Sequence, residues 1–161
     1  MSKLILIIVL MVFSAGISAQ EEIPALNQKI VDYVTPTLGT QVNRGECWDL
    51  AYEALNRNNA RWDGKFKYGI EINPTKVTVF PGDLIQFANV EIRYQKGNTT
   101  YTETMGQHTA IVYRVIDQEK KIFEIAHQNT NFSGRTVGLS ELNLGTIVKG
   151  KYWFYRPEPL D

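Results

Sequence analysis

One cysteine and two histidines are the side chains of this sequence best suited to nucleophilic chemistry. Cys47 is the sole cysteine among 161 residues, and His108 and His127 are the two histidines. A thiol that attacks a carbonyl needs a base to take its proton and a third polar group to orient that base. We therefore ask whether the fold can bring these three side chains together.

Cys47 lies in the first turn of a predicted helix. Apolar residues follow it at the spacing i, i+3, i+4, i+7, namely Trp48, Ala51, Tyr52 and Leu55. The unsatisfied N–H groups and the positive end of the helix dipole stabilise a thiolate at such a position, so we expect a lowered pKa for the Cys47 thiol. The alternative is a buried, inert cysteine, since free cysteine is among the most buried residue types.

The two histidines belong to a predicted hairpin. His108 begins the strand "HTAIVYRVI", and His127 lies near the end of "KIFEIAHQN", with the polar turn "DQEK" between them. A turn centred on Gln118 and Glu119 places His108 opposite Asn129, and strand alternation puts His127 on the same face. A slip of one residue would break this arrangement. The third group is then His127 or Asn129, and the alternative is two histidines on exposed strand ends.

Further candidates surround the thiol in sequence. Gln41 lies six residues before Cys47, where its amide could donate to an oxyanion together with the Cys47 backbone N–H. An ordinary polar loop residue is the alternative for Gln41. Trp48 and Trp62 are candidates for the walls of a substrate groove, although core packing is the favoured role for each of them.

The elements that would position these residues are two helices followed by strands. "PALNQKIVDYV" has helical spacing, and a second helix begins near Cys47 and ends in "NRNN". The remainder is rich in β-branched and aromatic residues: "PGDLIQFANVEIRYQ", "YTETM", the two histidine strands, "RTVGL" and "KGKYWFYRP". "SELNLG" is predicted as a one-turn connector. The fold class is α+β, with N-terminal helices packed on an antiparallel sheet of five or six strands.

The first 19 residues have the pattern of a secretory signal peptide. A basic start precedes the apolar run "LILIIVLMVF", and small residues lead to a predicted cleavage after Ala19. Ten apolar residues are too few to span a bilayer. We expect a secreted or periplasmic protein with no membrane attachment after cleavage.

Residues 20–161 are predicted to form a single domain. The precursor has 17 basic and 17 acidic residues and no basic patch, which argues against nucleic acid binding. We expect a monomer, and the sequence identifies no inhibitor or immunity protein. One cysteine and two histidines without metal-type spacing make metal binding a weak alternative, and no cofactor motif is present.

The motifs "GECWDLA", "PGDLIQF", "HTAIV" and "HQN" together resemble the CHAP branch of the papain-like superfamily, the cysteine, histidine-dependent amidohydrolases and peptidases. The resemblance covers roughly residues 41–157. It implies that Cys47 is the nucleophile, His108 the base and Asn129 an orienting amide. His127 stands where these enzymes often have glutamate, and the related NlpC-type enzymes use histidine as the third residue. The spacing of Gln41 and Cys47 equals that of the oxyanion glutamine and nucleophile in papain.

The motifs of a second family match this sequence more closely. "GECWDLA", "PGDLIQF", "HTAIV", "AHQN" and "YRP" are similar to the cysteine-proteinase-fold domain attached to fungal actin-patch proteins, including the histidine at His127. The two resemblances imply a cofactor-independent cysteine amidase or peptidase. With the export signal, we expect the peptides of peptidoglycan as substrate. A peptidase with another substrate and a non-enzymatic binding domain on the same fold are the alternatives.

Overall fold

The computed structural model describes residues 21–160, and the predicted signal peptide, residues 1–19, lies outside that range. Two helices come first, α1 (Ala25–Val34) and α2 (Cys47–Arg57), with the 3-10 turn η1 (Thr35–Thr37) between them. Both predicted helices are thereby confirmed. Within the described residues, no helix is long and apolar enough to cross a membrane.

The strands follow the helices and form one large and one small antiparallel sheet. Their bounds are β1 (Ala60–Arg61), β2 (Ile70–Ile72), β3 (Leu84–Lys96), β4 (Thr99–Asp117), β5 (Ile122–His127), β6 (Gly138–Asn143), β7 (Ile147–Arg156) and β8 (Glu158–Pro159), with the 3-10 turn η2 (Leu144–Thr146) before β7. The six-stranded sheet has the order β2-β7-β3-β4-β5-β6, and β1 pairs with β8. This arrangement confirms the predicted α+β class.

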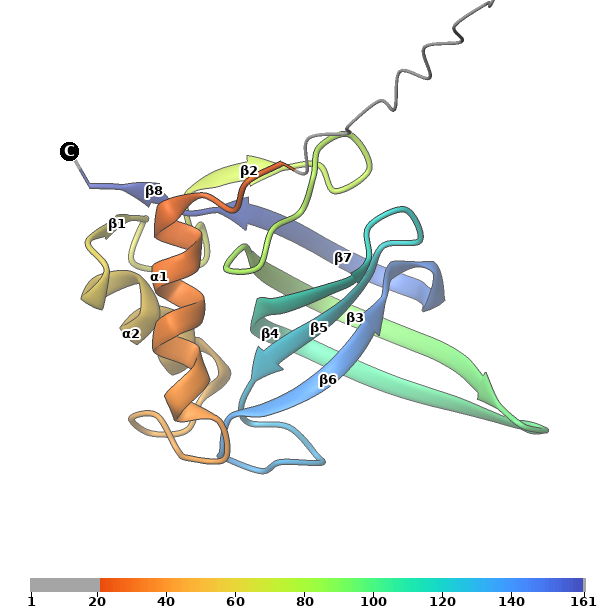
Figure 1. Cartoon of the computed structure of the whole chain (residues 1–161). Coiled ribbons are helices and arrows are strands. Elements are labelled where there is room, and N and C mark those ends of the chain that lie inside the picture. Colours follow the sequence, from red (N-terminus) through yellow and green to blue (C-terminus); the bar gives the residue numbers. More distant parts are fainter. Residues whose placement is uncertain (1–20, 161) are drawn as a thin grey trace, which may run out of the picture.

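The pleat of the large sheet separates two hydrophobic cores. On one face, Leu84, Ile111 and Ala126 pack with the buried side chains of α1 and α2. The neighbouring residues on the same strands, Ile85 and Ile125 among them, point to the other face and form a second core with Phe123 and Phe154. The helices therefore cover one face, while the long β3–β4 hairpin extends away from them (Figure 1).

A glycine turn fastens the first helix to the sheet just before β3. Gly82 has φ 85°, and a Cβ at this position would lie 2.3 Å from the carbonyl oxygen of Asn27, so the turn requires glycine. The buried Asp83 carboxylate accepts from the Asn27 amide at 2.8 Å and from the Arg156 guanidinium at 2.9 Å. The Pro81-Gly82-Asp83 turn thus ties α1, β3 and β7 together.

The hairpin that carries the histidines differs from expectation near its turn. Ile111 pairs with Ala126, which is the predicted register, but two register shifts between Val112 and Asp117 displace the pairing toward the turn. The predicted strands "YTETM" and "HTAIVYRVI" are one continuous strand, β4. The segment "SELN", predicted as part of a connector, is strand β6. Its residues pair with β5 at the edge of the sheet, so this polar segment is a strand and not a loop.

Candidate active site

A reciprocal set of hydrogen bonds fixes the beginning of α2 at Cys47. The Asp49 side chain, 1% exposed, accepts from the backbone N–H groups of Glu46 and Arg44 at 3.2 and 3.0 Å. The Glu46 side chain in turn accepts from the Asp49 backbone N–H, which completes a capping box. The Arg44 guanidinium also donates to Asp49, at 2.6 Å. Cys47 is therefore the first helical residue, as predicted.

The Cys47 thiol is partly buried and points at a backbone carbonyl. Its sulfur lies 4.0 Å from the carbonyl oxygen of Gln107. Burial raises the pKa of the Cys47 thiol above its ordinary value, and this outweighs the backbone N–H groups of Thr109 and Trp48, which favour the thiolate. The expectation of a lowered thiol pKa is therefore wrong, because desolvation exceeds the effect of the helix N-terminus.

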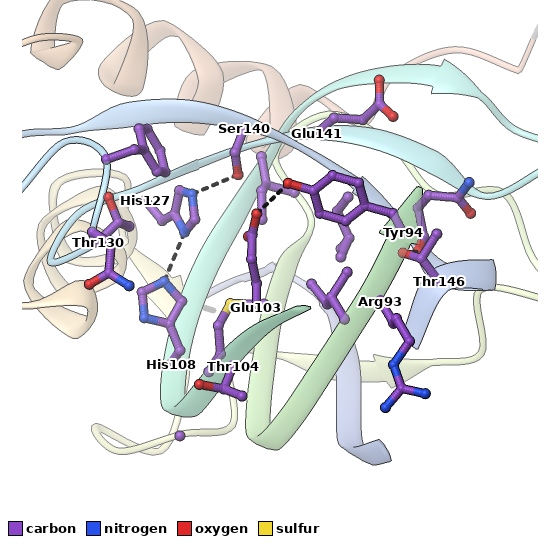
Figure 2. A pocket seen from close by; sticks show the side chains of 18 of the residues that line it. Arg93, Tyr94, Glu103, Thr104, His108, His127, Thr130, Ser140, Glu141 and Thr146 are labelled. Carbon is purple, nitrogen blue, oxygen red and sulfur yellow. Dashed lines mark hydrogen bonds between the residues drawn. The ribbon is translucent and has the colours of Figure 1, made fainter. Parts of the chain in front are cut away.

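The two histidines form a hydrogen-bonded chain that ends on a serine. Nε2 of His108 lies 2.8 Å from Nδ1 of His127, and Nε2 of His127 lies 2.8 Å from Oγ of Ser140. Figure 2 shows His127 between the other two side chains. His108 is 7% exposed and His127 is 4% exposed. The alternative of histidines on exposed strand ends does not describe these buried rings.

Burial keeps both imidazoles neutral near pH 7. It lowers the pKa of His108 to about 4. Burial lowers the pKa of His127 to about 3, with a further contribution from the neighbouring His108. Because His127 occupies Nε2 of His108, the nitrogen of His108 left for a thiol proton is Nδ1.

Cys47, His108 and His127 line one pocket of about 1350 Å³. Within residues 21–160, however, no hydrogen bond joins the thiol to either imidazole, and the thiol donates to Gln107 instead. Transfer of the thiol proton to His108 would thus require the Cys47 side chain to turn from the carbonyl toward the ring. Such contacts are often loose before a substrate binds.

Among the described residues, no hydrogen bond joins Asn129 to His108, although both residues line the pocket. Asn129 follows the end of β5, has φ 61°, and its amide donates to Oε2 of Glu46 at 2.8 Å. The predicted pairing of His108 with Asn129 is wrong, because β5 ends at His127, the backbone of Asn129 is left-handed and its amide binds Glu46. His127, the other candidate for the third group, is the residue that contacts His108.

Gln128 is a residue of the site that the sequence did not single out. Its side chain is fully buried, and its Nε2 donates to the carbonyl oxygens of Val42 and Glu46 at 3.0 and 2.8 Å. Its Oε1 accepts from the Val42 backbone N–H at 3.1 Å. This residue, next to His127, thereby fixes the loop that leads into Cys47. The motif "AHQN" contained Gln128, but nothing in its spacing indicated a buried amide.

Gln41 is not placed to bind an oxyanion. It is exposed, its Nε2 donates to the carbonyl oxygen of Asn43 at 3.0 Å, and it does not line the pocket. The loop turns at Asn43 and Gly45, both with positive φ, and this directs the Gln41 side chain outward. The backbone N–H groups of Cys47 and Trp48 are the remaining candidates for oxyanion donors, because the first N–H groups of a helix have no intrahelical acceptor.

Trp48 and Trp62 do not line the pocket either. Their rings pack together with centroids 5.6 Å apart, in a cluster with Tyr52 and Tyr68. Adjacent helical residues point about 100° apart, so the side chain after Cys47 faces another direction. Both tryptophans therefore support the helical layer, and their prediction as groove walls is wrong.

The aromatic side chain beside the histidines is Phe132. Its ring is 5.5 Å from the His127 ring and 58% exposed, and it lines the pocket. The rest of the pocket extends along β3, β4 and β6, the loop after β5 and η2. It combines apolar side chains such as Ile92, Met105 and Leu142 with polar ones such as Thr104, Thr130, Asn131, Asn143 and Thr146. Glu103 and Glu141 add carboxylates, and Arg93 adds one guanidinium. The pocket therefore extends well beyond the thiol and the two imidazoles.

Among the described residues, no cluster of three or more histidine, cysteine or acidic side chains is arranged to hold a metal ion. The groups that the site presents are a thiol, two neutral imidazoles and backbone N–H groups, with the hydroxyls, amides, carboxylates and guanidinium of the wider pocket. These groups can transfer protons and acyl groups.

Comparison with known proteins places the fold in a family. The family model of the AIM3/BBC1 cysteine proteinase-fold domain matches residues 24–161. No curated protein is significantly similar to the chain. A solved structure described as "The crystal structure of Ly7917" is similar with a TM-score of 0.47 and 15% sequence identity, over 80% of this chain and 62% of that one.

Proposed function

The chain belongs to the AIM3/BBC1 cysteine proteinase-fold domain family, and from this premise we propose that it is a cofactor-independent cysteine amidase or peptidase. The observation that carries the proposal is the placement of Cys47 and His108 in one pocket, with His127 hydrogen-bonded to His108 at 2.8 Å. In the proposed roles, Cys47 is the nucleophile, His108 the base and His127 the orienting group.

The proposed acylation step begins with a neutral Cys47 thiol and a neutral His108 imidazole. After the Cys47 side chain turns toward His108, Nδ1 takes the thiol proton as the sulfur forms a bond to the substrate carbonyl carbon. The backbone N–H groups of Cys47 and Trp48 stabilise the oxyanion. The amide C–N bond then breaks, and the departing nitrogen takes the proton from His108. The products are a thioester on Cys47 and a free amine.

Water completes the reaction. His108, neutral again, takes a proton from a water molecule that attacks the thioester carbon. The C–S bond breaks, and the sulfur regains the proton from the imidazolium. Since burial opposes a charged imidazole, we expect His108 to be protonated only transiently, with no thiolate–imidazolium pair before substrate binds.

We propose that the substrate is a peptide outside the cytoplasm. The stem peptides or cross-bridges of peptidoglycan are the favoured candidates. The predicted signal peptide supports an extracytoplasmic site of action. The large pocket, with hydroxyl, amide and carboxylate side chains along β4 and β6, suits an extended polar chain. Phe132 offers an apolar surface beside His127.

The test is incubation of residues 20–161 with purified peptidoglycan and with a general peptide library, followed by mass spectrometry of newly formed amino groups. We expect cleavage of stem-peptide or cross-bridge amides that is lost in Cys47→Ala. Arg57→Ala, which removes an exposed guanidinium of α2 that does not line the pocket, is the control and should retain cleavage. Cleavage confined to ordinary peptides would keep the reaction but refute the peptidoglycan substrate.

The contact between the Cys47 thiol and the Gln107 carbonyl favours a second function, peptide binding without cleavage. Because the sulfur points at the Gln107 carbonyl and burial raises its pKa, the domain could bind a peptide without cleaving it. In that event peptidoglycan fragments would bind the wild-type protein and Cys47→Ala with equal affinity, and neither would release new amino groups. Turnover by the wild-type protein would exclude this second function.

A further inference from the structure

We propose that Ser140 is a positioning residue that sets which nitrogens of the two histidines carry protons. The proposal rests on the function proposed above, because it assigns Ser140 a role in preparing His108 as the base. Ser140 lies on β6 directly opposite Ile125, whereas His127 lies opposite Gly138. Two-residue alternation therefore puts Ser140 and His127 on the same face of the sheet.

Two neutral imidazoles hold two ring protons between them. Each neutral ring has one nitrogen that donates and one that accepts. For Nδ1 of His108 to accept a thiol proton, the ring proton of His108 must be on Nε2, from which it is donated to Nδ1 of His127. The proton of His127 is then on Nε2 and is donated to Oγ of Ser140, 2.8 Å away.

The opposite direction of the chain would disable the base. If the Ser140 hydroxyl donated to Nε2 of His127, Nδ1 of His127 would donate to His108, and Nδ1 of His108 would already hold a proton. A carboxylate at the position of Ser140 could only accept and would exclude this second state. A hydroxyl can donate or accept. For Oγ of Ser140 to accept from His127, the hydroxyl must therefore donate its own proton to another acceptor.

The pocket provides room for that acceptor. Ser140 lines the pocket, and its hydroxyl makes no hydrogen bond to described residues other than the one to His127. Its proton can therefore be donated to water in the pocket while Oγ accepts from His127. We infer that an acceptor in the pocket at Ser140 stabilises the state in which His108 is the base.

The direct test is nuclear magnetic resonance of the whole mature chain with ¹⁵N-labelled histidine. Two histidines give two rings to assign, and His127→Gln identifies the signals of His108. At pH 7 we expect both rings of the wild-type protein to be protonated on Nε2. In Ser140→Ala we expect Nδ1-protonated rings to appear, whereas Ser140→Thr and the control Thr104→Ala should keep the wild-type pattern.

A wild-type ring of His127 protonated on Nδ1, or unchanged proton positions in Ser140→Ala, would overturn the proposal. The proton positions are measured without turnover. The role of Ser140 can therefore be contradicted while the proposed function stands, and the reverse also holds. Where turnover is measured, Ser140→Ala should lower kcat roughly tenfold, a factor typical for the loss of one hydrogen bond. KM should be unchanged, and Ser140→Thr should restore kcat; a rise in KM alone would contradict a positioning role.

Discussion

At the Cys47 thiol, burial and the helix N-terminus act in opposite directions. The N–H groups of Trp48 and Thr109 favour the thiolate, but desolvation raises the thiol pKa by more than they lower it. The same burial lowers the pKa of His108. Burial therefore favours a neutral thiol and a neutral imidazole in the free protein, and charge should develop only during the reaction.

This state makes a prediction for alkylation. Labelling of Cys47 by iodoacetamide should be slow at pH 6 and should rise with an inflection above the value of about 8.5 for a free cysteine, because the thiolate is the reacting species. The rate is measured by mass spectrometry of the intact protein between pH 5 and 10. Fast labelling at pH 6 that slows in His108→Ala would contradict it and would indicate a thiolate–imidazolium pair.

The third group can be tested by a pair of substitutions. His127→Ala removes the hydrogen bond to His108 and should lower kcat more than it raises KM, since orientation of the base acts in the transition state. Asn129→Ala should change kcat little, because the Asn129 amide contacts Glu46 and not His108. Steady-state kinetics on one cleaved substrate decide the matter. A silent His127→Ala combined with a costly Asn129→Ala would move the role to the amide.

Among the elements, α2 depends on the carboxylate of Asp49. Asp49→Ala would leave two backbone N–H groups and the Arg44 guanidinium without their acceptor. We expect unfolding free energy to fall by about 1–3 kcal/mol, measured by urea denaturation. Arg57→Ala, which removes a surface ion pair with Glu53 on the same helix and a cation–π contact with Tyr33, is the control and should cost at most about 1 kcal/mol. Equal losses for the two variants would argue against the cap.

The elements were predictable where local pattern decides them. Apolar spacing located α1 and α2, and Pro81-Gly82-Asp83 marked the beginning of β3. The segment "SELN" was mistaken because its polar residues resemble a loop, although pairing with β5 makes it a strand. Neither the left-handed backbone of Asn129 nor the outward turn of Gln41 is encoded in residue spacing, since both depend on the tertiary path of a loop.

For the whole molecule, the buried histidines make stability depend on pH. An unfolded histidine takes a proton near pH 6.5, whereas in the folded protein the pKa values are about 4 for His108 and about 3 for His127. Between pH 6.5 and about 4 the unfolded state binds more protons, so stability falls as pH falls. The slope should reach up to about 1.4 kcal/mol per pH unit for each histidine.

Urea unfolding at pH 7.0, 5.5 and 4.5 measures this dependence. The double variant His108→Gln and His127→Gln lacks both titrating rings. Its stability should therefore decline less steeply over the same pH range. Parallel declines in the two proteins would mean that carboxylates, not the histidines, cause the acid sensitivity.

The buried amide of Gln128 links the two halves of the site. It joins the end of β5, next to His127, to the loop before Cys47 through three hydrogen bonds. The helical layer cannot separate from the sheet without breaking all three and exposing a buried side chain to solvent. The thiol should consequently report on that separation: its labelling in the folded protein can proceed through a rare opened state, and the population of that state measures how firmly the two layers are docked.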